Sequence, residues 1–97
     1  MEATVTIFIE REHDHQFDHI AALSESIAEE LAQEYGIRWG WNNEKLEIRH
    51  SSARGFMLAE DGKITIELRL GFAASLFSSS IEQNIEQRLD QLLTPDF

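Results

Sequence analysis

Hydrophobic and polar residues alternate in five short segments of the chain. The clearest alternation sets Ile64, Ile66, Leu68 and Leu70 against Lys63, Thr65, Glu67 and Arg69. A period of two places successive side chains on opposite faces, so this pattern predicts a strand with one buried and one solvated face. Similar alternation predicts strands over residues 4–11, around Trp39 and Trp41, around Leu46 and Ile48, and in the segment that contains Phe56 and Leu58.

Two other segments repeat hydrophobic residues at helical spacing. The first contains Ile20, Leu23, Ile27 and Leu31, and the second contains Ile81, Ile85, Leu89 and Leu92. Residues three or four apart share one face of a helix, so each segment predicts an amphipathic helix. We expect Asp14 or Asp18 to cap the first helix, and Gly36 to end it in the left-handed conformation.

The segment before the second helix is less regular. Residues 72–77 predict a short helical lead-in, and the serines at 78–80 weaken its continuity with the helix that follows. Ser79 and Glu82 have the spacing of a capping box, and Pro95 lies where the helix is expected to end.

Short turns join the four later strands. Asn42-Asn43 and Asp61-Gly62 are hairpin signals, and residues 50–55 reverse the chain between them. The order β-α-β-β-β-β-α therefore predicts an α+β fold, a two-layer sandwich with two helices on one face of an antiparallel sheet. We assign residues 1–97 to a single domain, because 97 residues supply one core. Pairing between the first and fifth strands stays open.

Composition narrows the classes of partner and location. The chain has 18 acidic and 8 basic residues, and its net charge of −10 repels phosphate backbones and anionic lipid headgroups. We therefore expect no nucleic-acid partner. The absence of cysteine excludes disulfides and thiolate-bound zinc, and no hydrophobic run is long enough to span a membrane. The N-terminus has no secretion-signal pattern, so we expect a cytoplasmic protein, and we assign no cofactor.

Several stretches together resemble a bacterial protein family. They are residues 9–13 and 28–36, Trp41, Gly55, residues 64–72 and residues 81–86. In these stretches the chain is similar to the polyhydroxyalkanoic acid system family, also called polyhydroxyalkanoate granule-region proteins. The resemblance implies an association with polyhydroxyalkanoate storage or its granules, and it supplies no catalytic residues. The chain departs from the family pattern in its His13-Asp14-His15 segment and at Ser52, where a glycine is expected.

The histidines near the first helix form one candidate metal site. His13, His15 and His19 are close in sequence, and imidazole is a good ligand for zinc or nickel. The favoured interpretation is nevertheless a solvated helix entry, because no third firm ligand and no H-E-x-x-H motif accompany them. Carboxylates and serines elsewhere also lack a catalytic context, so we expect no enzymatic activity.

Two aromatic groups are candidates for contact with a ligand or surface. Trp39 and Trp41 share one strand face and could line a hydrophobic pocket, although core packing is the favoured use. Phe72, Leu76 and Phe77 concentrate large hydrophobic side chains beside a weak helix and could form an exposed patch. Cover for the sheet edge, or a homodimer contact, is the simpler interpretation of that segment.

The sequence leaves three hypotheses for the function of this protein. The first is a non-enzymatic granule-associated or regulatory protein that contacts a polyhydroxyalkanoate granule, or granule proteins, through the hydrophobic surface around Phe72–Phe77. The second is a domain that binds a small apolar ligand such as an acyl chain, with Trp39 and Trp41 in the pocket. The third is a metal-dependent enzyme that uses the early histidines.

Overall fold

The computed structural model describes residues 5–60 and 62–93. Its elements are β1 (Val5–Glu12), α1 (Phe17–Tyr35), β2 (Arg38–Asn42), β3 (Lys45–His50), β4 (Ala53–Glu60), β5 (Lys63–Leu70), α2 (Phe72–Ser75) and α3 (Ser78–Leu93). The predicted α+β order is confirmed, and α2 is the predicted lead-in to the last helix. The predictions made for Thr4, Asp61 and Pro95 lie outside the described residues, as does the side chain of Leu92.

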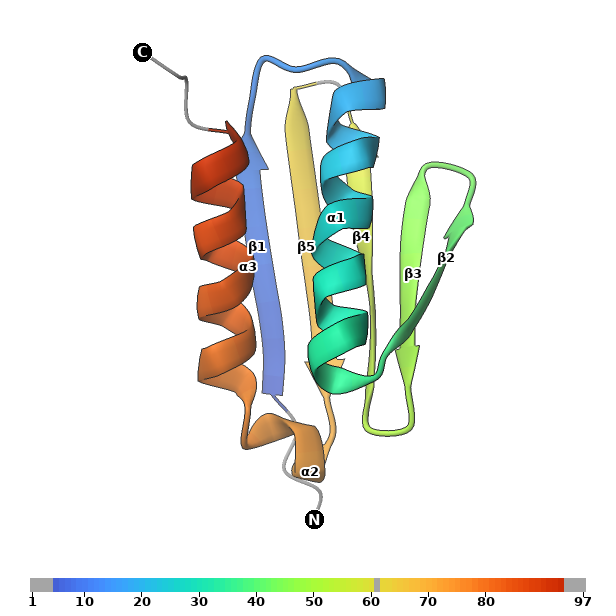
Figure 1. Cartoon of the computed structure of the whole chain (residues 1–97), viewed down its shortest axis with the longest axis vertical. Coiled ribbons are helices and arrows are strands. Elements are labelled where there is room, and N and C mark those ends of the chain that lie inside the picture. The colour runs from blue at the N-terminus through green and yellow to red at the C-terminus, as the bar shows by residue number, and fades with distance from the viewer. Residues whose placement is uncertain (1–4, 61, 94–97) are drawn as a thin grey trace.

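The five strands form one antiparallel sheet in the order β1-β5-β4-β3-β2. β1 pairs with β5 along its whole length, from Val5 opposite Leu70 to Glu12 opposite Lys63. The first strand therefore lies beside the last one, and β2 forms the other edge. Figure 1 shows α1 and α3 side by side across one face of the sheet, with α2 at the end where β5 finishes.

The core lies between that helix layer and the inner face of the sheet. α1 contributes Ile20, Leu23, Ile27, Ala28 and Leu31, and α3 contributes Ile81, Ile85 and Leu89. In β4 the residues that face this core are Met57 and Ala59. The sequence pattern located this strand by Phe56 and Leu58. These two residues lie on the other face of the sheet, away from the two helices, which is called the open face below.

The two predicted helix caps differ from the structure. The residue before α1 is Gln16, which makes no side-chain capping bond, so neither Asp14 nor Asp18 is the cap. Asp18 lies inside the first turn, where a carboxylate interacts favourably with the helix dipole. At α3, the Ile81 N–H donates to the Phe77 carbonyl, so the helix begins before Ser79 and the predicted capping box is wrong.

Two turn predictions hold, and each has a backbone cause. Gly36 ends α1 with φ 73°, and its N–H donates to the Ala32 carbonyl at 2.9 Å. Asn43 has φ 59° in the turn between β2 and β3, where asparagine tolerates a left-handed backbone.

Gly55 is required for the close approach of two strands. A Cβ added to it would lie 2.1 Å from the Glu67 carbonyl oxygen, so only glycine lets β4 and β5 approach here.

Candidate functional site

The end of the molecule that carries α2 exposes large hydrophobic side chains. Phe72 is 70% exposed, Leu76 77% and Phe77 53%. These three residues, here called the α2 patch, lie within six positions of one another. Single exposed hydrophobic residues are ordinary, but a group of three on one short segment is typical of a contact surface.

Specific contacts hold the α2 patch against the sheet. The Gly71 N–H donates to the Ser52 carbonyl at 2.7 Å, which ties the start of α2 to the turn between β3 and β4. The Ser75 hydroxyl donates to the Phe72 carbonyl at 2.7 Å, and Ala74 packs against the core. The segment is therefore anchored on one side, while Phe72 and Leu76 face outward.

A hydrophobic pocket opens beside the α2 patch, between the helices and the sheet. Its volume is about 160 Å³, the size of a cavity that holds a benzene-sized group. It is lined by Leu31, Tyr35, Ile37, Ile48, His50, Ser52, Ala53, Leu68, Leu70, Ala73, Ala74, Phe77 and Ile81. Phe77 belongs to both features, so the pocket and the α2 patch form one continuous apolar region.

Few polar groups approach this pocket. The His50 Nδ1 accepts a hydrogen bond from the Ser52 N–H at 3.0 Å, which fixes the ring at the turn. The Tyr35 hydroxyl is 3.2 Å from the Ser80 hydroxyl, and its ring centroid is 6.3 Å from that of Phe77. The site can therefore accept an apolar group, with an imidazole and a phenol at its border.

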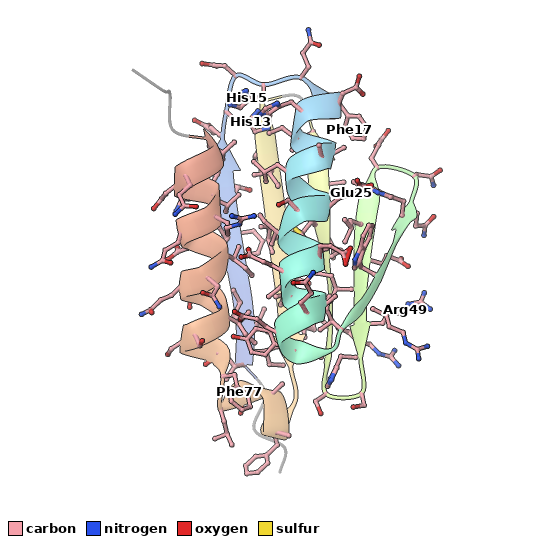
Figure 2. All side chains as sticks on the ribbon, in the orientation of Figure 1. His13, His15, Phe17, Glu25, Arg49 and Phe77 are labelled. Atoms are coloured by element: carbon pink, nitrogen blue, oxygen red, sulfur yellow. The ribbon has the colours of Figure 1, made fainter. Side chains whose placement is uncertain are left out.

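The structure separates Trp39 and Trp41 from the α2 patch. Both lie on the edge strand β2, half-buried on the inner face of the sheet opposite Ile48 and Leu46. The Trp41 Nε1–H donates to a Glu25 carboxylate oxygen at 2.6 Å, and its ring meets Phe17 edge-on at 6.5 Å. Neither tryptophan lines the hydrophobic pocket. Figure 2 shows Phe17 and Glu25 on α1 well away from Phe77.

The early histidines stack beside one another. The ring centroids of His13 and His15 are 5.8 Å apart, and those of His15 and His19 are 4.4 Å apart. The His13 Nδ1 accepts from the His15 N–H at 3.0 Å, so it is occupied by the backbone. Within residues 5–60 and 62–93, no group of three or more His, Cys, Asp or Glu side chains could hold a metal ion. His13 and His15 lie at the opposite end from Phe77 (Figure 2).

Comparison with known families gives a clear match. The family described as "Putative polyhydroxyalkanoic acid system protein" matches residues 7–93, which includes most of β1, the residues that line the pocket and the α2 patch. The chain belongs to this family. The comparison with curated proteins gives no significant match.

One solved structure supports the fold of this polyhydroxyalkanoic acid system protein. The NMR structure of PA4090 from Pseudomonas aeruginosa is similar at 10% identity, with a TM-score of 0.57. The likeness covers 99% of this chain and 88% of PA4090, and at this identity it concerns the fold alone. Of the helices described, none is long and apolar enough to cross a membrane.

Sequence reasoning missed a row of arginines on the open face of the sheet. Arg38 lies opposite Arg49, Arg49 opposite Arg54, and Arg54 opposite Arg69 on four neighbouring strands. Part of this arginine row could have been found, because Arg49 and Arg54 are equidistant from a turn centred on Ser51-Ser52. The rest depends on the strand order.

Two glutamates border the arginine row. Glu47 accepts from Asn42 at 3.3 Å and from Arg49 at 3.1 Å. The hydrogen bond from Asn42, and then that from Arg49, lower the pKa of Glu47 below its ordinary value, since both stabilise the carboxylate. Glu67 lies 3.7 Å from Arg69. The open face therefore carries ordered charge beside the exposed ring of Phe8.

Proposed function

We propose that this protein acts without catalysis, as a surface-contact component of the polyhydroxyalkanoate system. In this proposal the α2 patch adsorbs to the granule polymer or to a hydrophobic surface of a granule protein. The observation that carries the proposal is the exposure of Phe72, Leu76 and Phe77 beside an apolar pocket, at one end of a protein of this family.

The energy of such a contact is adequate for reversible adsorption. Burying a large hydrophobic side chain completely contributes about 1.5–3 kcal/mol. Phe72 and Leu76 have most of their surface available for burial, and Phe77 about half. Because α2 is anchored to the β3–β4 turn, little conformational entropy is lost when these side chains bind.

Co-sedimentation with purified polyhydroxyalkanoate particles tests the proposal. We expect Phe72→Asp and Leu76→Asp each to weaken binding about tenfold or more, because each places a charge in the contact. Phe77→Asp should act in the same direction, with its fold checked by circular dichroism because Phe77 also lines the pocket.

Phe8→Asp is the matched control. Phe8 is similarly exposed, at 57%, but lies on the open face of the sheet. The proposal is lost if the wild-type protein does not sediment with the particles, or if Phe8→Asp reduces binding as much as Phe72→Asp.

The pocket favours a second candidate function, the binding of a short acyl group. Its volume of about 160 Å³ suits part of such a chain, and Tyr35 and His50 border it. The Trp39 and Trp41 side chains would not take part, because they lie outside it. Native mass spectrometry of the purified protein should show a retained ligand, and Ala53→Leu, which fills the pocket, should abolish that ligand while leaving particle adsorption unchanged.

A further inference from the structure

The arginine row is unusual for a chain with a net charge of −10. Its four members, Arg38, Arg49, Arg54 and Arg69, are half of the 8 basic residues, and all four are exposed. They stand directly opposite one another across β2, β3, β4 and β5. Like charges in this arrangement repel, so the row destabilises the sheet unless anions lie nearby.

The protein supplies only part of the opposing charge. Arg49 pairs with Glu47 at 3.1 Å, and Arg69 lies 3.7 Å from Glu67. In the described part of the chain, Arg38 and Arg54 make no ion pair. Two guanidinium groups, each with a planar set of donors suited to phosphate or carboxylate, are therefore left for an external anion.

The arginine row lies at the same end of the molecule as the α2 patch. Arg49 and Arg54 are each one residue from the pair His50–Ala53 that closes the β3–β4 turn. Arg69 precedes Phe72 by three residues, about 10 Å of extended chain. The arginine row runs across the strands, perpendicular to their length. A flat surface that contacts the α2 end of the molecule would therefore lie parallel to the row. In Figure 2, Arg49 extends outward at the side of β3, in the same half of the molecule as Phe77.

Charge is divided between the two ends of the sheet. The other end carries the exposed carboxylates Glu12, Asp14, Asp18 and Glu60, whereas the exposed helix carboxylates at the arginine end include Glu34 near the end of α1 and Glu82 near the start of α3. The ends of β5 are about 23 Å apart by the rise per residue, whereas charges are screened over about 8 Å at physiological ionic strength. The net charge of −10 therefore does not decide the potential felt by a surface that touches the arginine end.

We propose that this end docks onto an anionic lipid surface, with the arginine row on the phosphate headgroups and the α2 patch in the apolar layer beneath. Arginine side chains extend readily from an apolar contact to a polar boundary. A nucleic acid or an acidic polypeptide would match the arginines but would leave Phe72 and Leu76 without an apolar phase. The proposal rests on the same α2 patch as the proposed function and adds the chemistry of a second surface.

Vesicle co-sedimentation tests this proposal. Two preparations are compared: phosphatidylcholine alone, and phosphatidylcholine mixed with phosphatidylglycerol in equal parts. We expect the protein to bind the mixed vesicles more tightly, and the difference to decrease as salt is added. Arg49→Gln and Arg54→Gln should each weaken this binding about fivefold. Arg54→Lys should weaken it less than Arg54→Gln, because lysine keeps the positive charge but lacks the planar set of donors.

Lys63→Gln is the matched control. It removes one positive charge from the same strand layer at the far end of β5, where Lys63 pairs with Glu10 at 3.4 Å. Its binding should equal that of the wild-type protein. Equal binding to both vesicle types, or an equal loss in Lys63→Gln, would overturn the proposal.

Two further readouts separate this proposal from its alternatives. Arg49→Gln and Arg54→Gln should bind polyhydroxyalkanoate particles as well as the wild type, while Phe72→Asp should weaken both kinds of binding. Loss of particle binding alone would therefore remove the proposed function and leave the lipid contact. If sedimentation velocity shows a dimer that Arg54→Gln dissociates, or if a single-stranded oligonucleotide binds through these arginines, the lipid proposal is wrong.

Discussion

The two faces of the sheet follow the same alternation of residues but are used differently. The inner face carries Ile48, Met57, Ile66 and Leu68, all buried beneath α1 and α3. The open face carries Phe8, Glu67, Phe56 and Glu47 in one row and the four arginines in the next, and none of the described helices lies over them (Figure 1). Burial restricts the inner face to hydrophobic residues that pack in the core. Charged residues can therefore be arranged for binding only on the open face.

The largest expected effect contrasts one residue from each face. Ile66 is fully buried, so Ile66→Ala removes buried surface and leaves a cavity, which should lower the free energy of unfolding by about 4 kcal/mol. Phe8→Ala, on the exposed face, should lower it by less than about 1 kcal/mol. Urea denaturation followed by circular dichroism measures both. Similar losses would mean that the open face is covered in solution.

Two glycines of the sheet differ in the same way, because one is crowded by a neighbouring strand and the other has free space around it. Gly55→Ala would bring a Cβ to within 2.1 Å of the Glu67 carbonyl, and forcing β4 and β5 apart should cost about 3 kcal/mol. Gly40 on β2 has no atom within 4 Å of the corresponding position, so Gly40→Ala should be neutral or stabilising, by up to about 1 kcal/mol. Thermal denaturation measures both variants. A loss of stability in Gly55→Ala alone would confirm the close approach of β4 and β5, whereas equal losses would mean that side chains are poorly tolerated at both glycines.

The Trp41–Glu25 hydrogen bond connects the edge strand β2 to the helix layer. Trp41→Phe keeps most of the ring but removes this 2.6 Å bond, so the free energy of unfolding should fall by about 1 kcal/mol. Trp39→Phe is the control, since Trp39 makes no side-chain hydrogen bond within the described residues. If both variants lose the same stability, packing rather than the hydrogen bond holds β2 in place.

Removing a charge from the arginine row should have a small effect of the opposite sign. Arg54→Gln relieves repulsion from Arg49 and Arg69, so the free energy of unfolding should rise by about 0.3 kcal/mol. Lys63→Gln loses its pair with Glu10 and should not stabilise the protein. Matched urea titrations at low salt show the difference best, and it should shrink as salt is added.

The smallest expected effect is a pH dependence at Glu47. Its pKa in the folded protein is lowered from 4.5 by hydrogen bonds from Asn42 and Arg49, so the folded state favours the carboxylate. This contribution to stability is fully present above pH 4.5 and is lost as the pH falls through the lower folded pKa. Compared with Glu47→Gln, the wild type should therefore lose stability in that acid range. Parallel curves for the two proteins would show that Glu47 is not stabilised in this way.

The candidate site was only partly predictable. The α2 patch was found because Phe72, Leu76 and Phe77 fall in a segment too short and too rich in serine for a regular amphipathic helix. The sequence pattern made Trp39 and Trp41 the candidates for lining a pocket, with core packing as the favoured use, whereas the pocket beside the α2 patch is lined by residues of α1, β3, β4, β5, α2 and α3. Sequence spacing places residues within an element, but it does not show which elements surround a given space.

The sequence by itself determined the elements and most of their inward faces, because local periodicity depends only on neighbouring residues. It also determined the end of α1, since Gly36 adopts a backbone conformation that most residues avoid. Only the tertiary structure decided that β1 pairs with β5 and that Arg69 stands opposite Arg54. These contacts join residues far apart in the chain, and their formation depends on how the sheet and helices pack together.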